Sequence, residues 1–510
     1  MLHRSLLIRN GLVVESATQV RHADIFVQDG IIETVDAGLA CSLSGAAQGN
    51  RVADRVIDAA GRMVVPGFVS SHYHSHDVLL RGSFEPMPLE GWFMVAVPAN
   101  YPKRSRAEIK ARALLGALEC LHGGITTVQD MATLFPFDED HVAATLEAYD
   151  EIGIRSVFAL QVADTPGQKA IPFWEQVVPA ELQKSLTGSV KPIGTGLQIL
   201  ETVERQIQLW RGKHARITWG LGPATPENCS TQFLEGIASL AKRIDCRVFT
   251  HAYESKSMAL HARTRYARHD GSLIRYLEHV GLLNERLTMA HGVWLRPDEI
   301  ERVAAAHTHV ALNPLSNLKS KSGVAPIREY LEAGVPVGLG TDNCSCSDAQ
   351  NMFQSMKMFC LLAAASHGSE GRPVAADALR AATEGSAAAL GLAGSIGRIA
   401  PGFKADLTLL NLSDPALQPL NDPIRQLVYS ECGRAVETVI VDGEVVIDQG
   451  RSCRIDEEAL FEAVARLMPG LRSDLAKVQE RNRAIAPYLR QAHELTLREN
   501  VGINRFIASP

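Results

Sequence analysis

The sequence predicts an α/β fold, a (β/α)8 TIM barrel, with β-rich segments at both ends of the chain. Three observations lead to this prediction. Through the middle of the chain, short apolar runs alternate with helical stretches, which is the pattern of βα units and a parallel sheet. Eight such runs can be counted, the number that a closed barrel requires. Before and after them, polar and apolar residues alternate as they do in half-buried strands.

The N-terminal segment, residues 1–65, is expected to consist of strands. It contains the stretches LLIRNGLVV, ADIFVQDGIIETVDAG and RVIDAAGRMVVPG, in which Gly and Asp mark turns. The same pattern returns in residues 396–455, in GRIAPGFKADLTLLNL and VETVIVDGEVVIDQGR. Both segments that flank the barrel are therefore predicted to be β-rich.

The barrel is expected over residues 66–395. Several of its apolar runs are almost continuously hydrophobic, as expected of strands that are buried on both faces. The main alternative is an open doubly wound sheet, but no G-x-G-x-x-G follows a predicted strand, which weighs against the dinucleotide-binding form of that fold. The eight runs are, in order, MVVPGFVSSHYH, GITTVQDM, IRSVFALQ, ITWGLGPA, CRVFTHAYE, LTMAHGV, HVALNP and VPVGLGTD.

Helices fit between most of these runs. Ser105 and Glu108 form an S-x-x-E capping box at the start of one helix, and Gly123 is expected to end it. Pro297 stands in the first turn of another helix, where its missing N–H costs little. The tail, residues 456–510, is rich in charge and in Ala and Leu at helical spacing, and is expected to cover the barrel or a second subunit.

The bulk composition limits the kinds of partner and the location. The chain of 510 residues is 46% hydrophobic with a net charge of −6, so it has no basic excess for binding nucleic acid. No run of about eighteen apolar residues is present, so no membrane span is expected. The nine cysteines show no disulfide spacing, and the first residues do not form a signal peptide. These features favour a reducing, cytoplasmic location.

Titratable residues gather where the predicted strands end. In a barrel the working face lies at the carboxyl ends of the strands. The first run ends in His72 and His74, whose spacing of two puts both imidazoles on one face of a strand. The other residues at strand ends are His251 and Glu254 after the fifth run, His291 after the sixth and Asp342 after the eighth.

This set of side chains predicts a metal site. Imidazole and carboxylate together suit a borderline divalent ion such as zinc or iron, and open positions on the ion would remain for water. Such an ion would lower the pKa of that water, and a nearby carboxylate would carry its proton. A single histidine at a strand end more often has a structural hydrogen-bonding role, so the prediction depends on several such positions in one barrel.

At these residues the chain resembles the metal-dependent amidohydrolase superfamily. The motifs run in order from NGLVV through VVPGFVSSHYHSH, HAYE, AHGVWL, NPLSN and GTDN to GRIAPGFKADL. The resemblance implies a (β/α)8 barrel with a small β-sandwich domain formed by both chain ends. Within the superfamily the chain is similar to the branch that holds cytosine deaminase, guanine deaminase and the triazine hydrolases.

That branch implies a role for each residue at the strand ends. Glu254 would move protons between water and substrate, and His291 would orient the water or polarise the substrate. The stretch ITWGLGPATPEN lacks the lysine of binuclear relatives, which implies one Zn2+ or Fe2+ ion per subunit. The implied ligands of that ion are His72, His74, His251 and Asp342, of which Asp342 is also catalytic.

The stretch TDNCSCSDAQNMFQSMKM is most similar to the atrazine chlorohydrolase and melamine deaminase group. Its two cysteines, Cys344 and Cys346, are interpreted as packing residues, because the ligand set is complete without them. In the NPLSN stretch, Asn313 stands where deaminases of this branch often have a histidine.

The expected substrate is a small molecule, a flat N-heterocycle or an aryl amide. Without a basic cluster, a free heterocycle or a nucleoside is preferred to a nucleotide. The expected reaction is deamination, and the alternatives are amide, carbamate or urea hydrolysis, chlorohydrolysis, or a metal-free scaffold. A homodimer or higher homo-oligomer is expected. The candidate substrate-binding residues are His76, Trp92, Asn317 and Asn343, with His76 placed in a loop beyond the first strand.

Overall fold

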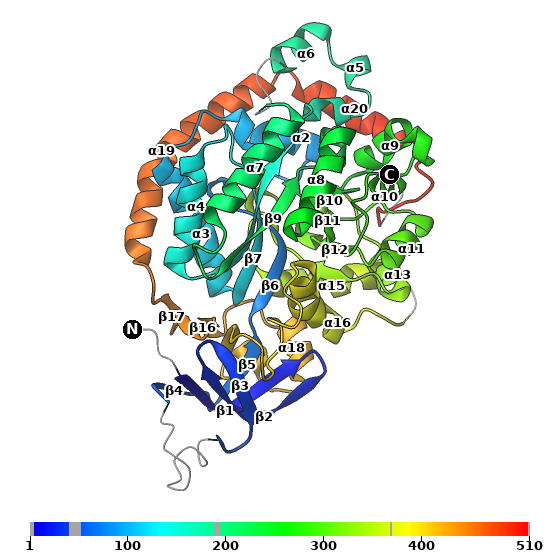
Figure 1. Ribbon diagram of the computed structural model, residues 1–510. Helices are drawn as coiled ribbons and strands as arrows, with labels where there is room; N and C mark the ends of the chain where they lie inside the picture. Colours follow the sequence, from blue (N-terminus) through cyan, green and yellow to red (C-terminus); the bar gives the residue numbers. More distant parts are fainter. Residues whose placement is uncertain (1–4, 40–52, 188–193, 368–369, 508–510) are drawn as a thin grey trace.

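The computed structural model describes residues 5–39, 53–187, 194–367 and 370–507. Figure 1 shows a barrel with helices around it, a β-rich unit at one end and two long helices along the outside. Among the described residues, no helix combines the length and apolar character needed to cross a bilayer. The eight described cysteines are unpaired, and Cys41 lies outside the described residues.

The barrel contains a strand in each of the eight predicted runs. Neighbouring strands pair in parallel in chain order, and β14 pairs with β6, which closes the sheet on itself. Two short pieces, separated only by residues 340–341, make up the eighth strand. The TIM-barrel prediction is therefore confirmed. The strands are β6(Phe68–His74), β7(Ile125–Ala132), β8(Arg155–Val162), β9(Ile217–Pro223), β10(Val248–Ala252), β11(Leu287–His291), β12(His309–Leu312), β13(Val337–Leu339) and β14(Asp342–Asn343).

The second sheet joins strands from both ends of the chain. Its central contact is between β5 and β15, which pair antiparallel with Leu407 opposite Pro66. The sheet has its own apolar core, and the prediction of one small β domain built from both ends is confirmed. The order is β18-β17-β16-β15-β5-β1-β2-β3, with β4 beside β1. The strands are β1(Ser5–Ser16), β2(Gln19–Gln28), β3(Ile31–Asp36), β4(Arg55–Asp58), β5(Arg62–Pro66), β15(Leu407–Asn411), β16(Val436–Val441), β17(Glu444–Asp448) and β18(Arg451–Ser452).

The first predicted run divides between the two sheets at Gly67. Strand β5 belongs to the small sheet and β6 to the barrel. A Cβ atom at Gly67 would lie 2.3 Å from the side chain of Thr126, so the chain can cross here only with glycine. We propose that the chain divides into units at this point and at the other expected boundaries, giving residues 1–65, 66–395, 396–455 and 456–510.

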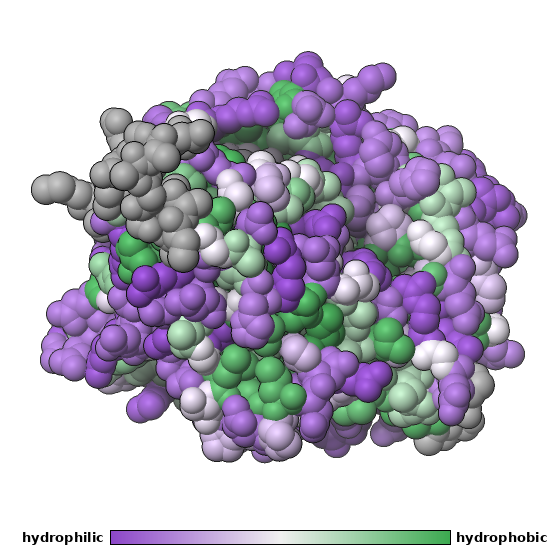
Figure 2. Space-filling view, turned by 90° about the horizontal axis from the view of Figure 1, so that it is seen from below, coloured by the Kyte–Doolittle hydropathy of each residue, from purple (hydrophilic) through white to green (hydrophobic). Residues whose placement is uncertain are grey.

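A buried ion pair joins the small sheet to the barrel. The guanidinium of Arg155, at the start of β8, donates to both carboxylate oxygens of Asp406 over 2.9 and 3.0 Å. Asp442 accepts from Arg155 over 3.3 Å and from Lys404 over 2.8 Å. The face of the small sheet that is turned away from the barrel looks mostly hydrophilic, with apolar residues in separate groups (Figure 2).

The helices around the barrel begin and end much as the sequence predicts. Helix α3(Arg106–His122) starts where the Ser105 hydroxyl accepts the Glu108 N–H, and it ends at Gly123. Helix α11(Pro297–Ala305) has its proline in the first turn. The other barrel helices are α4(Glu139–Ile152), α5(Trp174–Val177), α6(Ala180–Thr187), α7(Gly196–Trp210), α8(Thr231–Ile244), α9(Lys256–Arg265), α10(Leu273–His279), α12(Pro314–Lys319), α13(Ile327–Ala333), α14(Cys344–Ser347), α15(Met352–Ser366), α16(Ala375–Arg380) and α17(Ser386–Ala389).

Shorter helical turns complete the chain, together with one helix beside the small sheet. That helix is α18(Pro423–Tyr429), and the turns are η1(Val78–Leu80), η2(Pro98–Asn100), η3(Gly167–Ala170), η4(Pro226–Asn228), η5(Ala267–His269), η6(Ala381–Gly385) and η7(Pro415–Leu417).

The tail covers the barrel, as the sequence predicts. Helices α19(Glu457–Asn482) and α20(Ala486–Arg498) run along the outside of the molecule (red in Figure 1) and contact α2(Leu89–Ala96). Asn482 donates to the backbone carbonyl of Met94, and Leu471 packs in one apolar cluster with Trp92. The tail thereby supports the helix that lines the cavity described below.

Candidate metal centre and active site

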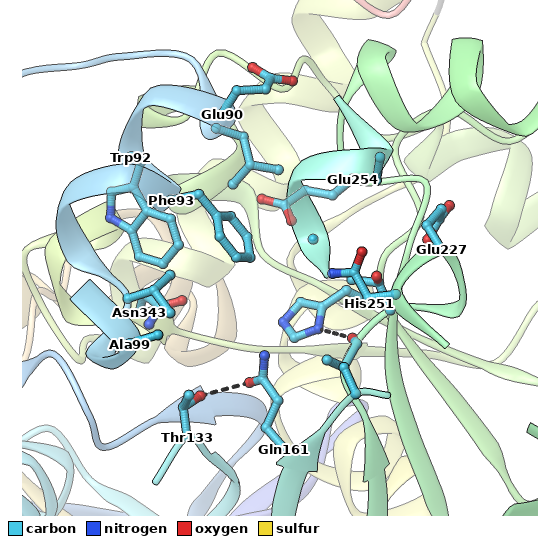
Figure 3. Close-up of a pocket in the computed structure, with 18 of the residues that line it drawn as sticks. Glu90, Trp92, Phe93, Ala99, Thr133, Gln161, Glu227, His251, Glu254 and Asn343 are labelled. Carbon is cyan, nitrogen blue, oxygen red and sulfur yellow. Dashed lines mark hydrogen bonds between the residues drawn. The ribbon is translucent and has the colours of Figure 1, made fainter. Parts of the chain in front are cut away.

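A cavity of about 290 Å³ lies at the carboxyl ends of the barrel strands. Its walls come from β6 and β14, from α2, and from the loops that follow β7, β8, β9 and β10. The residues that the sequence predicts as site residues converge here, with exceptions given below. Figure 3 shows the upper part of the cavity, where Phe93 and Glu254 face each other.

The four predicted ligands meet at the floor of the cavity. His72 and His74 end β6, His251 lies on β10 and Asp342 begins β14. An Asp342 oxygen lies 3.4 Å from His72 Nε2 and 3.5 Å from His74 Nε2, and the Nε2 atoms of His74 and His251 are 3.2 Å apart. Two ligand atoms that bind one ion at about 2.1 Å in a tetrahedron are roughly 3.4 Å apart. These three spacings fit one ion, and donor atoms of His72, His251 and His291 also lie within 4.8 Å of one another.

The hydrogen bonds of two histidines turn their lone pairs inward. Nδ1 of His74 lies 2.7 Å from the Met131 carbonyl, and Nδ1 of His251 lies 2.6 Å from the Ala224 carbonyl. A carbonyl only accepts, so both Nδ1 atoms carry hydrogen and both neutral rings point a bare Nε2 into the centre. Burial lowers the pKa of both rings to about 3, so they are neutral at pH 7. Two facing lone pairs repel each other unless a cation lies between them.

His72 and Asp342 also leave polar atoms unsatisfied. Nε2 of His72 and Oδ1 of Asp342 are buried without a hydrogen-bond partner among the described residues. Burial lowers the pKa of His72 to about 4. Burial alone would raise the pKa of Asp342, but His72 and His291 outweigh it and hold that pKa well below its ordinary range. The donor set is thus three neutral imidazoles and one carboxylate, which suits a divalent metal ion.

His291 and Glu254 lie beside this centre. His291 Nε2 is 3.5 Å from a Glu254 oxygen and 3.9 Å from an Asp342 oxygen. The backbone holds His291 at φ 75° and Asp342 at φ 58°, in the left-handed region that is uncommon outside glycine. Conformations of this kind are often found at functional sites, where the surrounding fold maintains them.

The electrostatic surroundings of Glu254 suit its expected role in proton transfer, which stays a prediction. Burial raises the pKa of Glu254 to about 7, and the negative fields of Asp342 and Glu90 add to the rise while His291 opposes it. A carboxyl with a pKa near neutral pH can both take and return a proton at comparable cost.

The sequence profile described as the amidohydrolase family matches residues 63–446, which include the whole barrel and the β5, β15 and β16 part of the small sheet. The chain belongs to this family. It is accordingly a metal-dependent hydrolase that acts on carbon–nitrogen bonds.

Two curated relatives are similar over nearly the whole chain of this amidohydrolase. A 5-methylthioadenosine/S-adenosylhomocysteine deaminase of Pyrococcus furiosus is 30% identical, covering 91% of this chain and 100% of the relative. A 5'-deoxyadenosine deaminase of Methanothermobacter thermautotrophicus is 32% identical, covering 91% of this chain and 97% of the relative.

Two solved structures share the fold of this amidohydrolase. A zinc-bound adenosine deaminase of Xanthomonas campestris has a TM-score of 0.78 at 25% identity and covers 92% of this chain and 98% of its own. A zinc complex of atrazine chlorohydrolase from Arthrobacter aurescens has a TM-score of 0.76 at 26% identity, covering 91% and 100%. The predicted resemblance to the deaminase and triazine hydrolase branch is confirmed.

In this amidohydrolase, Asn317 lies behind His291 instead of in the cavity wall. Its carboxamide oxygen accepts from His291 Nδ1 over 2.8 Å, and its side chain is almost fully buried. Asn317 is not among the residues that line the cavity, and its place suits a residue that orients His291; its expected contact with substrate stays a prediction. Asn313 lies on the same side, 3.5 Å from His291 Nδ1.

His76 and Asn343 line the cavity next to the metal centre. His76 Nε2 lies 3.2 Å from the Asn343 amide nitrogen, which can donate to it. Among the described residues, the groups of donor atoms close enough to share one ion do not include His76. We expect His76 to contact the substrate and not to bind the ion. This stays a prediction, and the position of His76 in the cavity wall suits it.

Trp92 is part of the cavity wall, and a hydrogen bond to Ser345 holds the N–H edge of its indole ring. Its indole N–H donates to the Ser345 hydroxyl over 2.8 Å, and the Asp77 carboxylate accepts from that hydroxyl over 2.6 Å. Cys344 is buried beside Arg81, and Cys346 packs in the same apolar cluster as Trp92. Burial raises the pKa of both thiols, in keeping with their predicted packing role.

Sequence reasoning missed several lining residues. Phe93 is 38% exposed and reaches further into the cavity than its neighbour Trp92 (Figure 3). Gln161 accepts from the Thr133 hydroxyl over 2.9 Å, and its amide nitrogen points into the cavity. Glu227 follows β9, in the stretch that lacks the lysine of binuclear relatives. Its position at a strand end was the one signal that could have found it.

Proposed function

We propose that this amidohydrolase is a deaminase of adenine nucleosides altered at the 5' position, with one zinc ion per subunit. The observation that carries the proposal is the inward-facing set of neutral histidines with Glu254 beside it. The curated relatives support the nucleoside assignment, because both are named as deaminases of such compounds. The zinc-bound structural neighbours support zinc over iron.

The proposed ligands of the ion are those expected from the sequence. When bound, the ion would make a water molecule a good nucleophile at neutral pH. Glu254 takes a proton from that water as its oxygen adds to the ring carbon that carries the amino group. Glu254 then delivers that proton to the ring nitrogen, and the proton of the added hydroxyl passes to the amino group. The exocyclic C–N bond breaks, ammonia leaves, and the ring carbon keeps the oxygen as a carbonyl. His291, held by Asn317, faces the same point and orients the reacting oxygen.

Purified protein with its native metal would be offered adenosine, 5'-deoxyadenosine, methylthioadenosine, adenine and a chlorinated s-triazine. We expect ammonia release and conversion of the adenine chromophore to hypoxanthine with the nucleosides. Chloride release from the triazine, without nucleoside turnover, would contradict the proposal and favour chlorohydrolysis. Elemental analysis on the same sample would count zinc and iron per chain.

Chlorohydrolysis is kept as a second candidate because the triazine hydrolase structures cover 91% of this chain. Hydrolysis of an amide, carbamate or urea would use the same residues. We further propose a cytoplasmic homodimer or higher homo-oligomer, which light scattering of the purified protein would test.

A further inference from the structure

One wall of the cavity carries a buried carboxylate that the proposed reaction does not use. Glu227 lies on η4, after β9, and only 5% of it is exposed. Neither of its side-chain oxygens has a hydrogen-bond partner among the described residues, although Glu227 lines the cavity. A buried carboxylate without hydrogen-bond partners raises the free energy of the folded protein. A ligand that donates hydrogen bonds to it would remove this cost and would itself be bound more tightly.

Two further acceptors lie on the same wall. Oδ1 of Asn228 and Oγ1 of Thr165 are also buried without a partner, and both residues line the cavity. The two loops are fixed to each other, since the Thr165 N–H donates to the Asn228 carbonyl over 3.1 Å. Ser230 donates to Asp164 through its backbone over 2.7 Å and through its hydroxyl over 2.5 Å. The backbone of the two loops that carry the acceptors is therefore fixed before any ligand arrives.

Away from the proposed metal centre, the charge of the cavity wall is one-sided. The carboxylates of Glu90 and Glu227 line it there, and none of its described lining residues is lysine or arginine. A cation that acts on Glu227 is Arg265, which lies outside the wall and donates to the Cys229 carbonyl over 3.1 Å. Burial raises the pKa of Glu227 to about 7 against the weaker effects of its own backbone, Arg265 and Thr225. A carboxylate group on the substrate would find no counter-charge on this described wall.

We propose that Glu227, together with Asn228 and Thr165, forms a second subsite that binds a protonated amine on a part of the substrate other than the reacting ring. An ammonium group has three donors and no acceptor, which matches acceptor oxygens on three residues. A positive charge is also the group that a wall of carboxylates favours. This inference rests on the proposed deaminase function, and it names the substituent that distinguishes the preferred nucleoside.

Three adenosine derivatives with a 5' thioether would test the subsite, ending in an aminoalkyl, an alkyl or a carboxyalkyl chain of equal length. We expect kcat/KM for the amine to exceed that for the neutral compound by about tenfold, with the carboxylate the poorest. In Glu227→Gln the preference for the amine should disappear, while the neutral compound keeps its kcat. Glu235→Gln, which removes an exposed carboxylate from α8, should leave kcat/KM unchanged for all three compounds.

Calorimetric titration of the same three compounds separates this inference from the proposed function. If none of the three compounds is deaminated, the proposed function is wrong. The subsite would still be established if the amine bound more tightly than the other two compounds and Glu227→Gln removed that difference. Equal binding of the three compounds by the wild-type protein would overturn the subsite. An equal loss with all three in Glu227→Gln would also overturn it, because it would show a structural role for this carboxylate.

Discussion

Nε2 of His74 and Nε2 of His251 face each other across 3.2 Å, and each ring donates its other nitrogen's hydrogen to a backbone carbonyl. Without a cation between them, this contact costs free energy, because two lone pairs meet in a buried place. The arrangement therefore predicts a protein whose stability depends on its metal.

His251→Ala should lower the metal content of the purified protein well below that of the wild type. Thermal unfolding should show that a chelator lowers the Tm of the wild type, since an ion bound to the folded state stabilises it. The same chelator should change the Tm of His251→Ala little. His279→Ala, at an exposed position on α10, is the matched control and should keep its metal. A wild-type Tm that does not change when the metal is removed would contradict this prediction.

Glu254→Gln should keep its metal and lose turnover. The amide preserves the size of the side chain but cannot accept a proton from water, so kcat should fall by about 10²–10⁴-fold. Elemental analysis and steady-state kinetics on one preparation measure both effects. If kcat fell less than tenfold with metal retained, another group would have to carry the proton.

Asn317→Ala should lower kcat more than it raises KM. The change removes the acceptor that holds His291 Nδ1, and loss of such a partner typically costs about 10–100-fold. Asn317→Asp keeps an acceptor at this position and should recover part of the rate. An equal loss in both variants, with a lower Tm, would indicate a packing role instead.

Phe93→Ala should raise KM several-fold with little effect on Tm, because this half-exposed ring offers the substrate an aromatic face. Trp92→Phe should lower Tm with little effect on KM, since it removes the N–H that donates to Ser345 inside the wall. Kinetics and thermal unfolding of the two variants together check the assignment. A KM that rises in Trp92→Phe alone would restore Trp92 as the stacking residue.

Acid should weaken the contact between the small sheet and the barrel. Burial favours a higher pKa for Asp442, but Lys404 and Arg155 hold it below its ordinary value of 3.8. A carboxyl of this kind adds stability above its unfolded pKa and loses it as the pH falls through the folded pKa. Asp442→Asn should therefore cost about 1 kcal/mol at pH 7, and the difference should shrink as the pH falls below 3.8.

Urea unfolding of the wild type and Asp442→Asn over a series of pH values measures this difference. Parallel stability curves down to the lowest pH at which the protein folds would show that Asp442 makes no net contribution through its charge.

The fold was predictable because the barrel strands are mostly buried and several of them appear as nearly continuous apolar runs. The expected boundary after residue 65 lies close to Gly67, but the different partners of β5 and β6 were not predictable, because both strands are buried and follow each other directly. His72, His74, His251 and Asp342 were accessible to sequence reasoning, since strand ends meet on one face of a barrel. The places of Phe93, Glu227 and Asn317 depend on how loops fold over the cavity, which no periodicity encodes.

The pairing of β5 with β15 has a consequence for the order of folding. Strands β1 to β5 pair with one another, but β5 finds its other partner, β15, only beyond the barrel in the chain, so the small sheet cannot be completed until the barrel has been synthesised. Contacts between such distant residues form slowly, and the edge of β5 that pairs with β15 would wait exposed during synthesis. The chain is therefore expected to need a chaperone, or slow release from the ribosome, more than a barrel closed by local contacts would.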